Sequence, residues 1–206
     1  ADKLERGDKW VLSKLNRLVK EVTENLDSFE IGVASAKVYD FIWDTYCDWY
    51  IELTKTRLNG ADDTAKLTAQ NVLCYVLVTL LKLLHPFMPF ITEEIYQALP
   101  KCGGAEDILM MSQWPEYSEA LNFPAEENAM EAVMDLIRAI RARRAEMNVP
   151  PSKKAEMQIV TAQPEPYRQG LHFIQRLAYA SNVTFPENAP ADVTGLVSVV
   201  THDATA

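Results

Sequence analysis

The stretch that decides the fold is Leu84-His85-Pro86-Phe87-Met88-Pro89-Phe90-Ile91-Thr92-Glu93-Glu94-Ile95-Tyr96. Pro86 lacks an N–H and disfavours helical geometry at His85, so a helix that enters this stretch ends or kinks there. Pro89 suits the first turn of a new helix, and the two glutamates that follow lie near its positive end. Because phenylalanine and methionine mostly fill cores, the stretch predicts a buried corner between two helices of a bundle.

Apolar residues at helical spacing place further helices on both sides of this corner. The Asn-Gly pair at residues 59 and 60 is typical of a helix end, and an aspartate at 62 or 63 can cap the next helix. The turn-rich segment 101–125 is expected to be a loop with a brief extended piece at 108–111. We expect helices over residues 8–26, 33–58, 63–84, 89–99 and 125–147.

The last part of the chain has a different pattern. Residues 157–161, 183–185 and 195–201 are typical of strands, and residues 166–180 are typical of a helix. The chain stops where such a sheet would need another strand, so we expect a truncated subdomain. The predicted fold class is therefore mainly α. It consists of an antiparallel helical bundle over residues 1–154, followed by a small partial α/β subdomain over residues 155–206.

Charge is unevenly distributed along the 206 residues, whose formal net charge is −9. Residues 1–20 hold six basic and three acidic side chains, and residues 138–154 hold six basic side chains and only Glu146. These segments carry +3 and +5, which leaves −17 for the remainder. Two basic clusters on an acidic body can bind an RNA backbone at chosen places, although both can also be ordinary solvated helix faces.

Several classes of chemistry are disfavoured by the residues present. Cys47, Cys74 and Cys102 are odd in number and far apart, and none has a histidine at ligand spacing, so they indicate a reducing cytoplasm rather than a disulfide framework or zinc site. The chain has no glycine-rich phosphate-binding motif. Lys82 interrupts the most apolar run, and the N-terminus lacks the apolar stretch of a signal peptide. We therefore expect no catalytic residues, metal or cofactor in this chain and no membrane span.

The proline corner resembles the anticodon-binding domain of class I aminoacyl-tRNA synthetases for branched aliphatic amino acids. Residues 8–15, DKWVLSKL, are similar to the first bundle helix of the valine and isoleucine enzymes. Residues 39–44, YDFIWD, residues 47–55, CDWYIELTK, and residues 147–154, MNVPPSKK, resemble the valine-specific members. The segments follow the order found in the family, and the resemblance covers nearly the whole chain.

This resemblance implies a fragment that binds tRNA(Val), reads its anticodon and positions it for aminoacylation. ATP and Mg²⁺ would serve the full-length enzyme, whose HIGH-like and KMSKS-like signatures are absent from these residues. The resemblance also implies catalytic and editing domains elsewhere in the same polypeptide, and we expect a cytoplasmic monomer. In the valine enzymes a coiled-coil tail would follow the last segment.

Candidate tRNA contacts follow from the way single-stranded bases are recognised, by stacking, edge hydrogen bonds and cations on phosphates. On the first helix, Trp10 would stack on a base, Lys14 and Arg17 would bind phosphates, and Asn16 would read a base edge. On the second, Trp43, Asp44 and Asp48 are further candidates. A third group would contact the RNA backbone: Arg138, Arg141, Arg143, Arg144, Lys153 and Lys154.

Structural roles compete with these assignments. Trp10 lies next to an apolar stripe and can be a core residue, and Trp43 can pack between the first three helices. Asp44 and Asp48 can neutralise cations on a neighbouring helix. Two other functions also remain open at this point. One is the equivalent domain of the isoleucine enzyme, and the other is a helical protein–protein adaptor with incidental basic patches. Salt-dependent RNA binding would favour the anticodon function over the adaptor.

Overall fold

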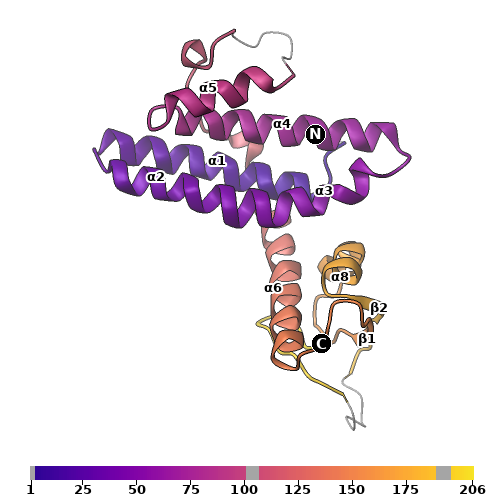
Figure 1. The fold of residues 1–206 in the computed structure, drawn as a ribbon. Helices are drawn as coiled ribbons and strands as arrows, with labels where there is room; N and C mark the ends of the chain where they lie inside the picture. The colour runs from indigo at the N-terminus through magenta and orange to yellow at the C-terminus, as the bar shows by residue number, and fades with distance from the viewer. Residues whose placement is uncertain (1–2, 101–106, 189–195) are drawn as a thin grey trace. The chain divides into compact units, whose positions relative to one another are not determined.

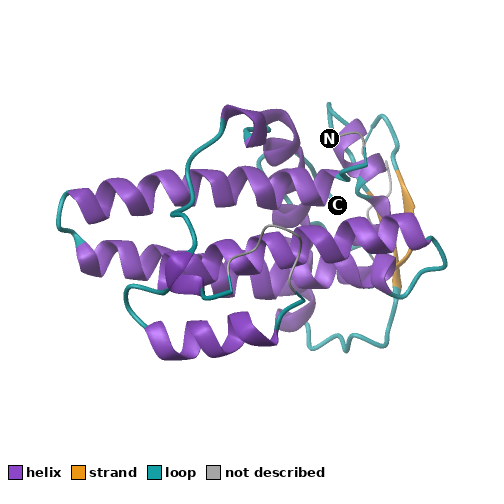
Figure 2. Cartoon of the chain, turned by 90° about the horizontal axis from the view of Figure 1, so that it is seen from above, coloured by secondary structure: helices purple, strands orange, loops and turns teal. Residues whose placement is uncertain are grey.

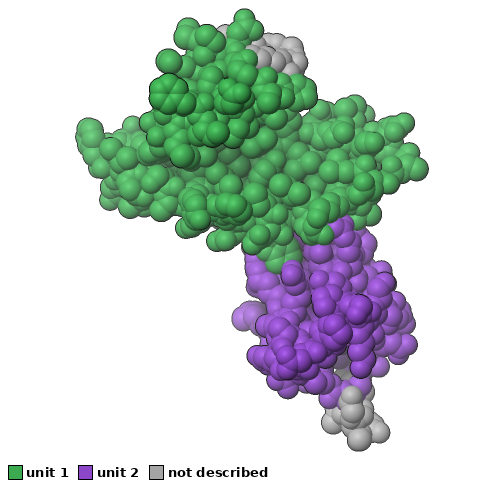
Figure 3. Space-filling model, in the orientation of Figure 1, with its two compact units in different colours: residues 1–127 green, residues 128–206 purple. Residues whose placement is uncertain are grey.

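The computed structural model describes residues 3–100, 107–188 and 196–206. The chain divides into two compact units, residues 1–127 and residues 128–206, which Figure 3 colours separately. The division lies inside the long helix α6, Pro124–Glu146, because most of this helix packs with the C-terminal unit. The boundary expected between residues 154 and 155 marks a change in secondary-structure class and stays a prediction.

The first unit is a helical bundle, as the sequence predicted. Helix α1, Arg6–Asp27, lies side by side with α2, Ile31–Asp40, and with α4, Asp63–Leu84 (Figures 1 and 2). The chain runs in opposite directions along α1 and α2 because only a short turn joins them. Helix α5, Pro89–Ala98, packs on α4. The mainly α fold class is therefore confirmed.

The helix expected over residues 33–58 is continuous but has an unusual middle section. Between α2 and α3, Ile51–Leu58, the ten residues of η1, Phe41–Tyr50, have the hydrogen bonding of a π-helix. Such segments are rare and are usually single wide turns. The next helix begins as predicted, because the Asp62 carboxylate accepts hydrogen bonds from the backbone N–H groups of Thr64 at 2.9 Å and Ala65 at 3.1 Å.

The proline corner joins α4 to α5 as predicted, with Pro89 in the first turn of α5. His85 Nδ1 lies 2.8 Å from the Thr92 hydroxyl, which in turn donates to the carbonyl of Met88. The expectation that the whole corner is buried is wrong, since the Phe90 side chain is 90% exposed. Helix α5 buries Thr92 and Tyr96, four residues apart on one face, and this leaves Phe90 on another face.

The segment between α5 and α6 differs from its prediction. Residues 109–111 form a short 3₁₀ turn, η2, Leu109–Met111, instead of an extended piece. Leu109 packs in a small core cluster with Leu81 and Tyr96, whereas Met110 and Met111 are exposed. A second 3₁₀ turn, η3, Glu119–Leu121, precedes α6. Only one of the four apolar residues at 108–111 is therefore buried in the bundle.

The second unit combines α6 with a small α/β arrangement. Strands β1, Ala155–Gln158, and β2, Ala180–Thr184, pair in parallel, with Met157 opposite Val183. The connection contains α7, Glu165–Gln169, and α8, Leu171–Leu177, so the single helix expected over residues 166–180 is divided at Gly170. A crossover connection of this kind is what a parallel pair requires.

The third expected strand is not formed by residues 196–201; residue 195 lies outside the described residues. Val200 makes an isolated antiparallel bridge with Thr205, and Val160 makes another with the same residue. The chain turns back on itself here, since the N–H of Thr201 donates to the carbonyl of Ala204. A tight reversal of this kind pairs residues 199–206 with each other and leaves only single bridges instead of a strand.

Helix α4 is long and apolar enough, by length and composition, to cross a membrane. In the structure it packs against α1, α3 and α5, and it buries Val72, Val76 and Leu80. These contacts are typical of a core helix in a bundle. The absence of a membrane partner stays a prediction.

Candidate nucleic-acid interface

The candidates on α1 are divided between the core and the surface. Trp10 is fully buried, and the Lys14 ammonium lies 5.5 Å from the centre of its ring. Asn16 is also buried: its amide donates to the carbonyl of Ser118 at 2.9 Å and accepts from the N–H of Ser118 at 2.8 Å. In this structure a base cannot stack on the Trp10 ring, because the ring is buried. The Asn16 amide uses both its oxygen and its nitrogen to bind the backbone of Ser118, directly before η3. The core role considered for Trp10 fits this position.

Two basic side chains of α1 form ion pairs with glutamates in the first turn of α6. Lys9 forms an ion pair with Glu126 at 2.8 Å, and exposed Arg17 pairs with Glu127. The Ser13 hydroxyl donates to the same Glu127 carboxylate at 3.0 Å. The hydrogen bond from Lys9 is the main cause that lowers the pKa of the Glu126 carboxyl. An incoming phosphate must therefore compete with these carboxylates for Lys9 and Arg17.

The candidates on η1 lie at the surface. The Trp43 side chain is 52% exposed, and its ring centre lies 6.3 Å from that of Tyr39, which is 62% exposed. Asp44 and Asp48 are also exposed. The structure thus brings together an accessible aromatic pair and carboxylates on one helical segment. Sequence reasoning missed Tyr39 as part of this surface, although its spacing of four from Trp43 on a predicted helix was a signal.

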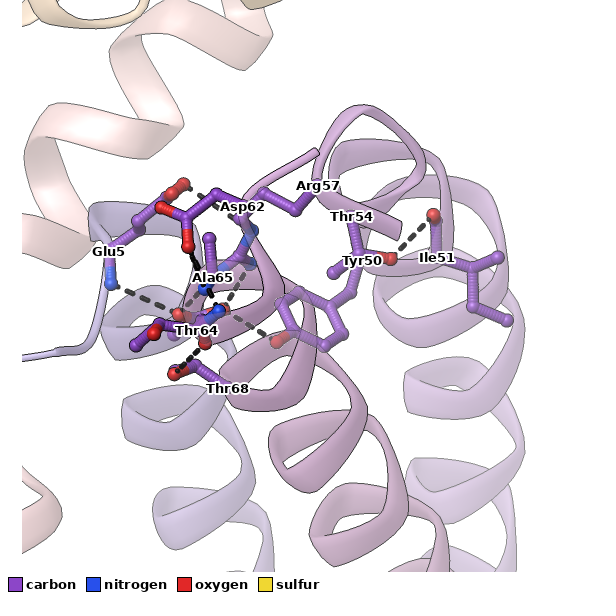
Figure 4. Close-up of polar contacts among 10 residues, drawn as sticks. Glu5, Tyr50, Ile51, Thr54, Arg57, Asp62, Thr64, Ala65 and Thr68 are labelled. Atoms are coloured by element: carbon purple, nitrogen blue, oxygen red, sulfur yellow. Dashed lines mark hydrogen bonds and ion pairs between the residues drawn. The ribbon is translucent and has the colours of Figure 1, made fainter. Parts of the chain in front are cut away.

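A buried ionic network holds η1, the segment that carries Trp43, against α1 and α3 (Figure 4). The fully buried Asp8 carboxylate accepts a hydrogen bond from the Tyr50 hydroxyl at 2.7 Å and from Arg57 Nη1 at 2.7 Å. Glu5 Oε2 lies 3.5 Å from Arg57 Nε. Burial, followed by the neighbouring Asp8 carboxylate, raises the pKa of Tyr50 well above its ordinary value. The network connects α1 to η1 and α3, and no short-range pattern predicted it because its members lie 42 and 49 residues apart.

In the second unit, the exposed arginines lie along the C-terminal part of α6. Arg138 pairs with Asp135 at 2.7 Å, and Arg143 pairs with Glu146 at 3.0 Å. Exposed pairs of this kind are weak, so a phosphate can replace the carboxylate at little cost. Three other exposed cations have no acidic partner among the residues that the structure describes: Arg141, Lys153 and Lys154.

Arg144 is oriented differently from its neighbours. Its guanidinium donates to the backbone carbonyl of Pro150 at 3.1 Å and to that of Lys153, and it lies 5.5 Å from the ring centre of Tyr179. The side chain is half-buried. The structure therefore places Arg144 among internal partners, whereas it places the other five basic candidates of this unit at the surface.

The described residues offer no metal-binding arrangement. No group of three histidine, cysteine, aspartate or glutamate side chains lies close enough to hold a metal ion within residues 3–100, 107–188 and 196–206.

Comparison with known proteins identifies the family. The family model described as the anticodon-binding domain of tRNA ligase matches residues 8–159. The chain is 50% identical over 197 residues to a valine–tRNA ligase of Clostridium acetobutylicum, which covers 91% of this chain and 22% of that protein. It is 38% identical over 206 residues to the valine–tRNA ligase of Staphylococcus carnosus, with 96% of this chain and 23% of that protein covered. The chain thus spans about a fifth of the length of these relatives, and it belongs to the family of anticodon-binding domains of tRNA ligases.

Proposed function

We propose that this chain is the anticodon-binding part of a valine–tRNA ligase and that its partner is tRNA(Val). The observation that carries the proposal is the similarity to valine–tRNA ligases along more than nine-tenths of the chain, at up to 50% identity. Exposed cations on both units and an accessible aromatic pair, Tyr39 in α2 and Trp43 in η1, support it, because these are the groups that bind single-stranded RNA.

Within this proposal the candidate residues have different tasks. The Trp43 ring, with Tyr39 beside it, would stack on an unpaired base, and Asp44 or Asp48 would accept hydrogen bonds from a base edge. The cations would bind phosphates. They are Lys14, Arg17, Arg138, Arg141, Arg143, Lys153 and Lys154. Trp10 and Asn16 would support this surface from inside the bundle instead of touching RNA.

The full-length enzyme would activate valine with ATP and Mg²⁺ and esterify it to the tRNA. The catalytic and editing domains of the same polypeptide would supply that chemistry, in the cytoplasm and from a monomer. Anticodon binding would contribute affinity and register, so that remote binding energy positions the acceptor end for reaction. The isoleucine enzyme's equivalent domain has less support, because the relatives compared above are valine–tRNA ligases.

The decisive experiment is a titration of the chain with tRNA(Val) at two salt concentrations, beside the same tRNA with its middle anticodon adenine replaced. We expect tighter binding of the unmodified tRNA and a loss of affinity at the higher salt concentration. Equal binding of both tRNAs, or no binding at low salt, would contradict anticodon recognition by this chain.

A protein contact is the second candidate function, and one observation favours it. Met88, Phe90 and Ile91 present exposed apolar side chains at the start of α5. Large exposed apolar side chains that gather in one place are typical of protein interfaces. Binding to a protein through this face would be insensitive to salt, so the two-salt titration also separates the two functions.

A further inference from the structure

The Arg144 guanidinium links three segments of the second unit. It extends from α6, donates to the carbonyls of Pro150 and Lys153 in the following loop, and lies over the ring of Tyr179 before β2. A guanidinium has a planar face and several N–H donors in fixed directions, so one side chain can satisfy two carbonyls and stack at the same time. This combination of contacts is specific to arginine.

Within the described residues, Arg144 supplies the side-chain hydrogen bonds that reach the loop after α6, and the other contacts come from the backbone. Asn148 has a φ of 54°, a left-handed conformation that ends the helix, and Pro150 and Pro151 contribute no N–H donors. At its start, the N–H groups of Asn148 and Val149 donate to the α6 carbonyls of Ala145 at 3.0 Å and Arg144 at 2.9 Å. Beyond the prolines, the Lys153 N–H donates to the Pro150 carbonyl at 3.1 Å and the Ala155 N–H to the Tyr179 carbonyl at 3.2 Å. Arg144 therefore connects to the loop at both ends of the Pro150–Lys153 turn.

The same loop carries Lys153 and Lys154, both exposed and without an acidic partner among the described residues of the chain. We propose that Arg144 is a positioning residue that holds these two lysines toward the RNA backbone and does not itself contact RNA. This inference rests on the function proposed above. It assigns Arg144 a task different from that of Arg141 and Arg143, its exposed neighbours on α6.

The test compares charge with shape by measuring tRNA(Val) affinity against salt concentration. Arg144→Lys keeps the positive charge but loses the planar fork, so we expect it to weaken binding nearly as much as Arg144→Gln. K is the association constant for tRNA(Val), and the slope of log K against log[salt] is negative. The double variant Lys153→Gln/Lys154→Gln should reduce the magnitude of this slope by roughly 1.4 to 1.8, for two lost phosphate contacts. Adding Arg144→Gln to that double variant should cause no further loss of affinity.

Arg143 is the matched control, because it is exposed and its ion pair with Glu146 lies at the surface. Arg143→Lys should keep the salt slope, and Arg143→Gln should lower it by roughly 0.7 to 0.9 in any background. Hydrogen exchange supplies a second readout that needs no RNA. In Arg144→Lys the amides of Lys153 and Ala155 should exchange faster, while those in the first half of α6 keep their protection.

The outcomes separate the two proposals. If Arg144→Lys binds like the parent chain, or if the loss from Arg144→Gln adds fully to that of the double-lysine variant, Arg144 is a phosphate contact and the positioning role is overturned. If the parent chain shows no RNA binding at low salt, the proposed function fails and this role fails with it.

Discussion

Two tryptophans show how position decides the role of a residue in this protein. Trp10 and Trp43 both lie on helices of the first unit, and both were candidates for contact with tRNA. Trp10 is fully buried, whereas about half of the Trp43 side chain is exposed beside Tyr39. A buried ring contributes to stability and an exposed ring is available to a ligand, so substitutions at the two positions should have opposite consequences.

Trp43→Ala is expected to weaken tRNA binding by about 1–3 kcal/mol, the usual contribution of one base stacked on an aromatic ring. The free energy of unfolding should change little, because much of the side chain is already in water. Trp10→Ala is the contrasting variant and should lower stability by about 3–5 kcal/mol by leaving a cavity. Urea unfolding and an RNA titration of both variants check this, and unchanged affinity in Trp43→Ala would remove that ring from the interface.

Asp8→Ala tests the buried network. The variant leaves the Arg57 guanidinium, which is only 10% exposed, and the Tyr50 hydroxyl without their shared acceptor. Removing one partner of a buried ion pair costs about 3–5 kcal/mol, because the other charge stays buried and uncompensated. The measurement is the free energy of unfolding in urea. Glu5→Gln, at the half-exposed edge of the same network, should cost less than about 1 kcal/mol, and equal losses in both variants would contradict this account.

At the scale of elements, Gly170 explains why the single helix expected over residues 166–180 is divided into α7 and α8. A Cβ at this position would lie 2.9 Å from Val133 Cγ2 on α6 and 3.3 Å from the Pro166 carbonyl oxygen. The chain between α7 and α8 therefore approaches α6 so closely that only glycine fits without a shift. Periodicity detects the apolar residues of the two helices, but it does not detect this close approach.

Gly170→Ala is expected to destabilise the chain by about 1–3 kcal/mol, the usual cost of overpacking. Val133→Ala makes its own cavity, but it also removes the methyl groups that the new Cβ would meet. The double variant should therefore be more stable than the sum of the two single changes predicts. The free energies of unfolding in denaturant of the parent chain, the two single variants and the double variant form a double-mutant cycle. Strict additivity would show that the contact with Val133 does not cause the destabilisation by Gly170→Ala.

At the scale of the whole molecule, charge distribution matters more than net charge. The chain carries −9, yet basic side chains are exposed on both units. Several are held in weak surface pairs with carboxylates, such as Arg138 with Asp135. An acidic body of this kind disfavours RNA except where cations gather, which contributes specificity without any base contact.

Binding of tRNA is accordingly expected to weaken steeply with salt. Each phosphate contact contributes roughly 0.7 to 0.9 to the magnitude of the slope of log K against log[salt], so several contacts should produce a slope between about −2 and −6. The titration is made from low to physiological salt with tRNA(Val). A slope near zero would contradict the assigned cations and favour the protein contact on α5.

The sequence by itself determined the helices of the first unit, an aspartate cap at 62 or 63, the helix start at Pro89 and the family, because these depend on residues close together in the chain. Spacing of apolar residues and the geometry of proline and aspartate act over one or two helical turns. The prediction of a mainly α bundle was therefore confirmed, and the resemblance to anticodon-binding domains was confirmed over residues 8–159.

Only the tertiary structure decided which candidate side chains reach the surface. Trp10 is buried in the bundle, and Asn16 is held by Ser118, far away in the sequence. Arg144 binds the carbonyls of the loop that follows its helix, and Phe90 is exposed because α5 packs by another face. A residue's exposure depends on what the rest of the chain places against it. Burial and partnership are long-range quantities that local patterns do not contain.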